Sequence, residues 1–191
     1  QKFTSNGGFL LYLGTEGTGA GRSTGDGQFH NPKGISVDRA GNVYVAETIN
    51  NRVQGFDGNG RFRRKGGWEG SGDGQFNRPT GIAIDRAGNV YVADRDNHRV
   101  QVFDSNGRFQ RKWGSEGSGN GQFDRPRYVA VDGAWNVYVS DSGNHRVKVF
   151  APVRPSPSTP VPISTPSPAS TPTPGTFEEL SSVEKNLVGL W

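Results

Sequence analysis

The chain has 191 residues with a formal net charge of +4, and it contains 29 glycines, no cysteine and no methionine. The lack of cysteine excludes a disulfide framework and a thiolate metal site, and no stretch reaches the roughly 18–20 apolar residues of a membrane-spanning helix. A hydrophobic fraction of 31% with so many glycines favours short strands joined by tight turns over a helical globule.

A repeat with a period of 47 residues runs through most of the chain. Gly-Asp-Gly-Gln-Phe at residues 25–29 returns at 72–76, and it returns as Gly-Asn-Gly-Gln-Phe at 119–123. The first two copies are identical at 33 of 47 aligned positions. One such unit is too small to bury its own apolar face, so the copies are expected to stack. We place them at residues 25–71, 72–118 and 119–150.

The first predicted element in the chain is a strand over residues 8–13. Residues 3–9 match residues 103–109, where the second repeat enters its fourth strand. The N-terminal strand is therefore an orphan outer strand. The third repeat stops at residue 150 after its third strand, so the orphan at the front fits the vacancy at the back.

Each repeat is expected to contain four antiparallel strands, most clearly the second. Residues 81–85 and 90–94 are apolar and rich in β-branched and aromatic side chains. Residues 99–103 alternate polar and apolar, and residues 108–113 are charged. Four antiparallel strands without a helix are typical of one β-propeller blade, with the apolar strand near the axis and the charged strand outside.

These residues resemble the NHL repeat. The string Asn-His-Arg-Val at residues 97–100 recurs at 144–147, and the first repeat has Asn-Asn-Arg-Val at 50–53. The resemblance covers about residues 3–150 and implies an all-β propeller of NHL type, commonly six-bladed. It does not imply one activity, since relatives include protein-binding, RNA-binding and, more rarely, enzymatic propellers.

Three blades' worth of strands cannot easily close a ring, because each blade would have to turn by ~120° against the modest twist between neighbouring sheets. Two arrangements remain open. Two chains can pair as a homodimer that completes a six-bladed ring, or the chain is a piece of a longer protein with further blades. We favour either over a stable lone half-ring.

Residues 151–175 are rich in proline, serine and threonine and predict an extended linker. Residues 176–191 predict a short helix or the start of a truncated second domain, because their apolar residues approximate one helical stripe. Linkers of this composition often occur in secreted proteins, so we predict an extracellular or cell-surface location.

Carboxylates recur in every repeat, which favours a structural role, because catalysis needs an acid–base pair only once. We expect them to cap turns or pair with Arg52, Arg99 and Arg146. The recurring carboxylates are Asp38, Asp85 and Asp132 after the first strand, and Glu47, Asp94 and Asp141 after the second. His98 and His145 have Asn51 as their counterpart, so we predict loop hydrogen bonds rather than a metal site. No catalytic residue, metal or cofactor is predicted.

Residues that break the repeat carry more information about function. Tyr128 replaces a glycine, Trp135 replaces a turn glycine, and Gly55 replaces a strand valine. Tyr128 is placed to stack on a ligand at the mouth of the central channel.

The loops between second and third strands and between repeats are expected on one face, which is the candidate binding surface. Its residues are Arg78, Arg95, Asn97, His98, Arg125, Arg127, Tyr128, Asn144 and His145. The leading function is a non-enzymatic scaffold that binds a protein or glycan there. One alternative is an RNA-binding propeller that uses the basic loop face. A second is a lyase or lactone hydrolase at the propeller axis.

Overall fold

The computed structural model describes residues 1–16 and 25–151, which fall within one compact unit, Gln1–Val153. The predicted linker beyond residue 151 and the predicted helix at 176–191 lie outside the described residues. Within the described ranges, no helix combines the length and the apolar character needed to cross a bilayer.

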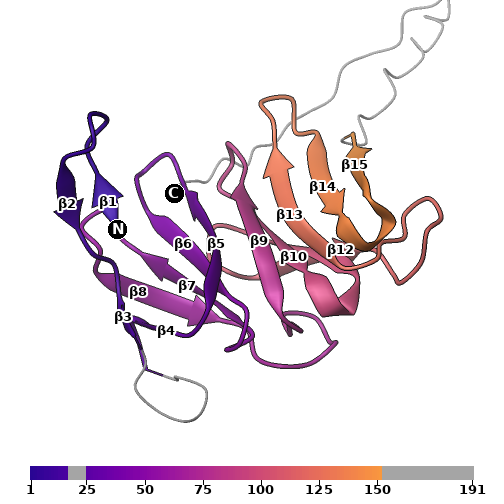
Figure 1. Cartoon of the computed structure of the whole chain (residues 1–191), viewed down its shortest axis with the longest axis horizontal. Helices are drawn as coiled ribbons and strands as arrows, with labels where there is room; N and C mark the ends of the chain where they lie inside the picture. Colours follow the sequence, from indigo (N-terminus) through magenta and orange to yellow (C-terminus); the bar gives the residue numbers. More distant parts are fainter. Residues whose placement is uncertain (17–24, 152–191) are drawn as a thin grey trace, which may run out of the picture. The chain divides into compact units, whose positions relative to one another are not determined.

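Antiparallel sheets that follow one another in chain order make up the unit (Figure 1). The first contains β5 (Pro32–Val37), β6 (Val43–Glu47), β7 (Arg52–Phe56) and β8 (Phe62–Gly66). The second contains β9 (Pro79–Ile84), β10 (Val90–Asp94), β11 (Arg99–Phe103) and β12 (Phe109–Trp113). The third contains β13 (Pro126–Val131), β14 (Val137–Asp141) and β15 (Arg146–Phe150). Single 3₁₀ turns, η1 (Arg95–Asn97) and η2 (Ser142–Asn144), precede β11 and β15.

The four strands predicted for the second repeat agree with β9 to β12 to within two residues at each end. The turn between β9 and β10 forms because Asp85 accepts backbone N–H bonds from Ala87 and Asn89, at 2.8 and 2.9 Å. Gly88 supplies the left-handed backbone that this turn requires, with φ of 85°. The register then pairs Val90 with Ile84 on one side and with Phe103 on the other.

The first strands of successive sheets lie against one another, with β9 between β5 and β13. The Thr80 hydroxyl donates to the Arg127 carbonyl at 2.7 Å, and the Thr48 hydroxyl donates to the Pro79 carbonyl at 2.9 Å. The sheets are therefore propeller blades with the apolar strands innermost, as predicted, and the charged strands β8 and β12 at the opposite edge of each sheet.

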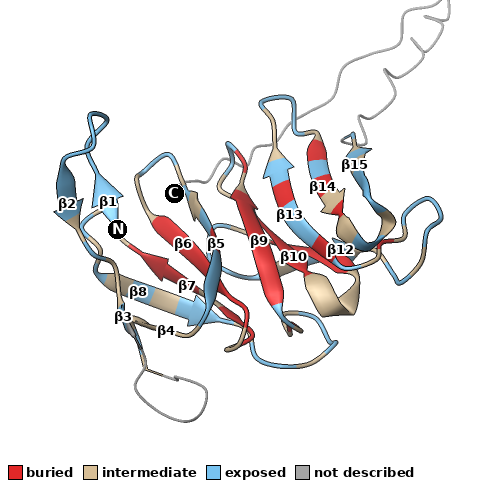
Figure 2. Cartoon of the chain, in the orientation of Figure 1, coloured by how far each residue is buried: buried red, intermediate tan, exposed pale blue. Residues whose placement is uncertain are grey.

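The core lies between neighbouring blades. Figure 2 shows the buried residues concentrated on β6, β7, β9 and β10, and alternating with exposed residues along β13. One cluster joins Tyr91 and Val100 of the second blade to Val139 and Phe123 of the third blade. Each blade thus buries one face against the next, as stacked repeats must.

The N-terminal residues form a hairpin that resembles the outer hairpin of a blade, and its second strand falls within the residues 8–13 expected to form an orphan outer strand. The hairpin contains β1 (Lys2–Phe3) and β2 (Phe9–Leu11). Its register pairs Phe3 with Phe9, just as Phe103 pairs with Phe109. β3 (Thr15–Glu16) then pairs in parallel with β4 (Gln28–Phe29), and the later repeats have matching bridges from Glu69 to Phe76 and from Glu116 to Phe123.

Two glycines set the spacing between the inner strands. A Cβ added at Gly34 would lie 2.2 Å from the Thr80 carbonyl oxygen, and one at Gly81 would lie 2.6 Å from the Arg127 carbonyl oxygen. Tyr128 occupies the equivalent position in the third blade. If a further blade packed against the third at the same spacing, the Tyr128 Cβ would clash with the backbone of that blade. A homodimeric six-bladed ring therefore stays a prediction, and it requires a wider interface at Tyr128.

We expect Gly81→Ala to lower the free energy of unfolding by about 1–3 kcal/mol, because the new methyl group meets backbone atoms that cannot rotate away. Gly66→Ala is the matched control, since a Cβ at Gly66 meets nothing within 4 Å. It should change stability by no more than about 0.5 kcal/mol. Chemical denaturation measures both, and equal effects would contradict the proposed role of Gly81.

Candidate functional site

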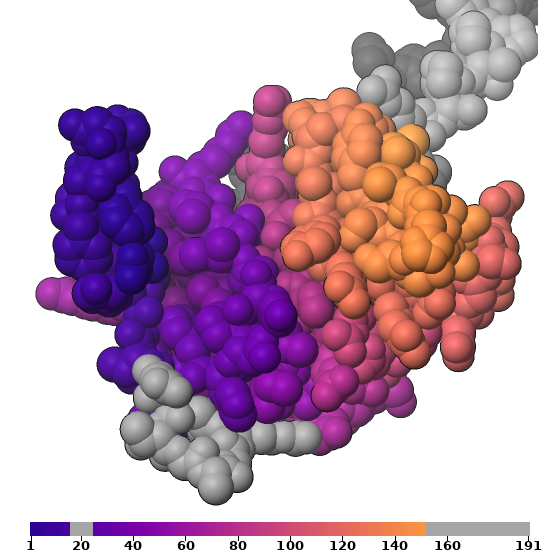
Figure 3. Space-filling model, in the orientation of Figure 1, coloured from indigo at the N-terminus to yellow at the C-terminus, as the bar shows by residue number. Residues whose placement is uncertain are grey.

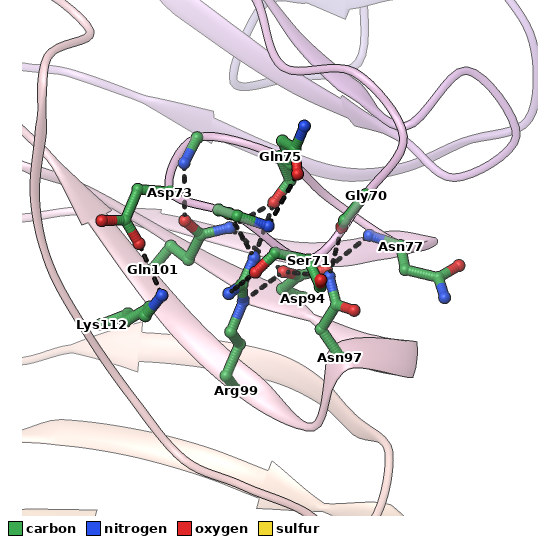
Figure 4. Close-up of polar contacts among 12 residues, drawn as sticks. Gly70, Ser71, Asp73, Gln75, Asn77, Asp94, Asn97, Arg99, Gln101 and Lys112 are labelled. Carbon is green, nitrogen blue, oxygen red and sulfur yellow. Dashed lines mark hydrogen bonds and ion pairs between the residues drawn. The ribbon is translucent and has the colours of Figure 1, made fainter.

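A buried carboxylate at the end of the second strand organises each blade (Figure 4). In the second blade Asp94 is fully buried. It accepts hydrogen bonds from Arg99 Nε at 2.7 Å, Asn97 Nδ2 at 2.9 Å, Gln101 Nε2 at 3.1 Å and the Asn77 amide at 2.7 Å. Burial nonetheless raises the pKa of Asp94, although these donors act to lower it.

The same network holds the Gly-rich connector. Arg99 Nη2 donates to the carbonyls of Gly72 at 2.8 Å and Gln75 at 2.9 Å. The Gln101 side chain donates to the Gln75 carbonyl at 2.6 Å and accepts from the Gly74 amide at 3.0 Å. The connector is therefore fastened from both sides, and its backbone groups are used within the fold.

The other blades repeat this arrangement, which confirms the predicted pairing of the carboxylates with arginines. Arg52 Nε lies 2.6 Å from Glu47, and Arg146 Nε lies 2.8 Å from Asp141. Burial acts to raise the pKa of Asp141, but the hydrogen bonds that it accepts outweigh burial and the pKa is lowered. Arg146 is 37% exposed against 7% for Arg99, since Arg99 lies inside a covered blade.

The second carboxylate series caps the turns after the first strands, also as predicted. Asp132 Oδ1 accepts from the amides of Ala134 at 2.8 Å and Asn136 at 2.9 Å, and Oδ2 accepts from Asn136 Nδ2 at 2.8 Å. The Asn136 side chain is the largest influence that lowers the pKa of Asp132. Partial burial acts to raise the pKa of Asp38, but donors led by Asn42 lower it.

Loops of successive blades contact one another at one end of the strands, which brings the candidate binding residues onto a common side. The Arg78 amide donates to Asn51 Oδ1 of the preceding repeat at 2.7 Å, and the Arg125 amide nitrogen lies 3.3 Å from His98 Nδ1 of the preceding repeat. We call this side the loop face. The strand register places it at the start of β5, β9 and β13.

Several candidate residues on the loop face point into the fold. Asn97 donates to Asp94 and to the Gly70 carbonyl, and Asn144 does the same with Asp141 and the Gly117 carbonyl. His98 Nδ1 lies 3.3 Å from both the Phe123 carbonyl oxygen and the Arg125 amide nitrogen. His98 therefore makes the loop contacts predicted for it.

The remaining candidates are Arg78, Arg95, Arg125, Arg127, Tyr128 and His145. Arg95 is paired with Asp96 at 2.6 Å, and Arg78 lies 3.9 Å from the same carboxylate. Arg125 and Arg127 are exposed, and neither guanidinium group forms a hydrogen bond or ion pair with another described residue. Tyr128 is 66% exposed.

Arg125, Arg127 and Tyr128 belong to the third blade. This blade forms one side of the unit in the space-filling view, where it is coloured orange (Figure 3). Sequence reasoning missed one residue beside them. Ser140 stands where the first two repeats have the buried Ala46 and Ala93, and its hydroxyl accepts from the Tyr128 amide at 2.8 Å. Alignment of the three repeats position by position contains the signal for this change.

The described residues hold no group of three or more histidine, cysteine, aspartate or glutamate side chains that could bind a metal ion. The histidines of the second and third repeats, His98 and His145, accordingly do not join such a group.

Antiparallel blades packed through their inner strands define a β-propeller. The model of the NHL repeat matches residues 29–56, 76–103 and 123–150. Each match runs from the phenylalanine of the connector to the end of a third strand, and so covers the buried carboxylate network. The chain therefore contains three NHL repeats.

Similar known proteins agree with this assignment. Protein lin-41 of Caenorhabditis elegans is 48% identical over 56 residues, which are 29% of this chain and 4% of that protein. B-box type zinc finger protein ncl-1 of the same organism is 47% identical over 38 residues, 20% of this chain and 4% of that protein. The chain thus spans a small part of either relative.

A solved structure of a protein of unknown function from Bacteroides thetaiotaomicron supports the fold. It superposes with a TM-score of 0.52 at 16% identity, over 58% of this chain and 32% of that chain.

We expect Arg99→Ala to lower the free energy of unfolding by about 3–5 kcal/mol, because the Asp94 charge is left buried without its partner. Lys112→Ala is the control, since its pair with Asp73 is about half exposed and should contribute about 0–1 kcal/mol. Urea denaturation of both variants measures the difference. A small effect of Arg99→Ala would show that the pair does not hold the blade together.

Acid should weaken the fold through the turn carboxylates. The pKa values of Asp38 and Asp132 are lower in the fold than the unfolded value of about 3.9. Their contribution is therefore present above about pH 4 and is lost as the pH falls through the folded pKa values. The double variant Asp38→Asn/Asp132→Asn should show a shallower fall in unfolding free energy between about pH 5 and 2. If the unfolding free energy of the double variant falls with pH as steeply as that of the unmodified chain, these two carboxylates do not cause the loss of stability in acid.

Proposed function

We propose that the chain is a non-enzymatic binding module whose loop face takes an anionic ligand, with single-stranded RNA as the ligand class that fits best. The observation that carries the proposal is the group formed by Arg125, Arg127 and Tyr128 on the third blade. Among the described residues, neither guanidinium group has an acidic partner, and both arginines lie within three residues of Tyr128, whose ring is 66% exposed. Arginine binds phosphates in pairs of hydrogen bonds, and unpaired bases stack on aromatic rings.

The rest of the loop face supports a positively charged binding surface. Lys33 is exposed at the start of β5, and Arg78 is exposed before β9. Asp96 is the acidic neighbour of Arg78, but it is already engaged by Arg95 at 2.6 Å. The buried carboxylates Glu47 and Asp141 are held by their own arginines and contribute no free negative charge.

A protein ligand is the second candidate, and one observation favours it. On the outer side of the third blade, Tyr138, Val147 and Val149 are 38%, 64% and 57% exposed. Their counterparts in the second blade, Tyr91, Val100 and Val102, are buried under the next sheet. Exposed apolar patches of this kind are typical of protein interfaces. Glycan binding, secretion or surface display, and enzymatic activity remain predictions of the sequence.

RNA binding can be tested by fluorescence anisotropy with a labelled single-stranded 12-nucleotide RNA between 50 and 200 mM salt. The double variant Arg125→Ala/Arg127→Ala should bind more weakly, and its salt slope should fall by about 1.4, which corresponds to two lost phosphate contacts. Tyr128→Ala should cost about 1–3 kcal/mol of binding free energy with an unchanged slope, because stacking involves no counterions.

Arg39→Ala/Arg86→Ala is the matched control. It removes the same charge from exposed arginines in the turns at the opposite end of the strands. Equal losses in both double variants would indicate unspecific charge attraction and contradict a site on the loop face. An unmodified chain that does not bind RNA at 50 mM salt would reject RNA and leave the protein ligand as the proposal.

A further inference from the structure

A cavity of about 380 Å³ lies between the first and second blades, near their outer strands. Its lining includes Tyr44, Val53, Arg64, Trp68, Phe76 and Phe103. This volume falls within the range of about 300–1,000 Å³ that small-molecule sites occupy. The cavity is separate from the loop-face group of Arg125, Arg127 and Tyr128, none of which lines it.

The cavity exists because Gly66 has no side chain at a position of the repeat where the other copies carry a large one. Leu13 packs against the cluster around Phe56 at the N-terminal side of the first blade. Trp113 packs against Phe150 between the second and third blades, with ring centroids 5.6 Å apart. Gly66 is the equivalent residue between the first and second blades, and a Cβ there would meet nothing within 4 Å.

A second glycine, Gly55, enlarges the same cavity. Val102 of the second blade is 2% exposed and fills its interface with the third blade. Gly55 is its counterpart in the first blade, and an added Cβ would lie at ordinary contact distances, 3.4 Å from Arg64 and 3.6 Å from Tyr44. Two glycines, Gly55 and Gly66, thus line one cavity, whereas the equivalent positions of the second repeat carry the side chains of Val102 and Trp113.

The chemistry of the lining defines the ligand. Phe76 and Phe103 form an aromatic wall with ring centroids 5.7 Å apart, and Val90 and Val92 extend the apolar surface. Arg64 brings a positive charge to this wall. Its Nη2 donates to the Tyr44 hydroxyl at 2.8 Å, and it forms no salt bridge with any described residue.

Trp68 is 59% exposed and also lines the cavity, so it offers a further aromatic surface to an incoming ring. Asp104 is the acidic residue of the lining, and its Oδ1 accepts the amides of Asn106 and Arg108, at 2.8 and 2.9 Å. The Arg64 charge is among the causes that lower the pKa of Asp104. Because Lys65 also lines the cavity, its basic side chains outnumber its acidic one, and the formal charge of the lining is positive.

From these features we infer that the cavity is a binding site for a small aromatic molecule that carries an anionic group. The rings lie between the Phe76–Phe103 wall and Trp68, and the anionic group accepts hydrogen bonds from the Arg64 guanidinium. Gly55 and Gly66 are the residues that determine whether the site exists.

The test uses 1-anilinonaphthalene-8-sulfonate, an aromatic anion whose fluorescence rises in an apolar site. The unmodified chain should bind it saturably at one site. Gly66→Leu installs the residue that stands at position 13 and should weaken binding at least tenfold by filling the cavity. Arg64→Gln should weaken binding of the sulfonate about fivefold, but not binding of the uncharged analogue N-phenyl-1-naphthylamine.

Gly55→Val fills the cavity from the other strand and serves as the second variant if Gly66→Leu does not fold, as judged by circular dichroism. Ile35→Ser is the control for unspecific adsorption, since it removes an apolar side chain that is 62% exposed elsewhere on the first blade. It should leave binding unchanged. Affinity that is unchanged in the folded cavity-filling variants, or an unmodified chain without saturable binding, would overturn the proposal.

Discussion

The fold depends on a buried carboxylate–arginine pair that recurs in each blade. Charged groups cost several kcal/mol to remove from water, so such a pair is tolerated only when every remaining donor and acceptor is satisfied. Asp94 and Arg99 meet this condition by using Asn97, Gln101 and the carbonyl groups of the Gly-rich connector. The pair therefore joins two strands of one sheet to the segment that enters that sheet from the preceding blade. This attachment sets the position of each blade relative to its neighbour.

Spacing between the inner strands is the second constraint, and it explains why the third blade differs from the first two. Gly34 and Gly81 allow backbones to approach closely, whereas Tyr128 cannot. The change to tyrosine is accompanied by a serine in place of a buried alanine, and the two residues bond to each other. The tyrosine side chain at this position is 66% exposed.

Function in a repeat protein of this kind concentrates where the repeat is broken, because the regular positions are already committed to structure. The breaks take two opposite forms. Tyr128 adds bulk on an exposed side of the third blade, which creates a surface. Gly55 and Gly66 remove bulk between the first two blades, which creates a cavity. Neither break disturbs the buried carboxylate network, so both are compatible with the same fold.

The sequence by itself determined the blade, its four strands and the pairing of Glu47, Asp94 and Asp141 with arginines, because these features are local and repeat every 47 residues. It also predicted a strand near the N-terminus, where β2 pairs with β1 in the register by which β12 pairs with β11. Only the tertiary structure decided which loop residues are free. His98 and Asn97 turned inward while Arg125 and Arg127 did not, which depends on contacts with the neighbouring blade. The cavity likewise could not be predicted from the sequence. Gly55 and Gly66 lie on different strands, and they line one cavity only because the first two blades pack together.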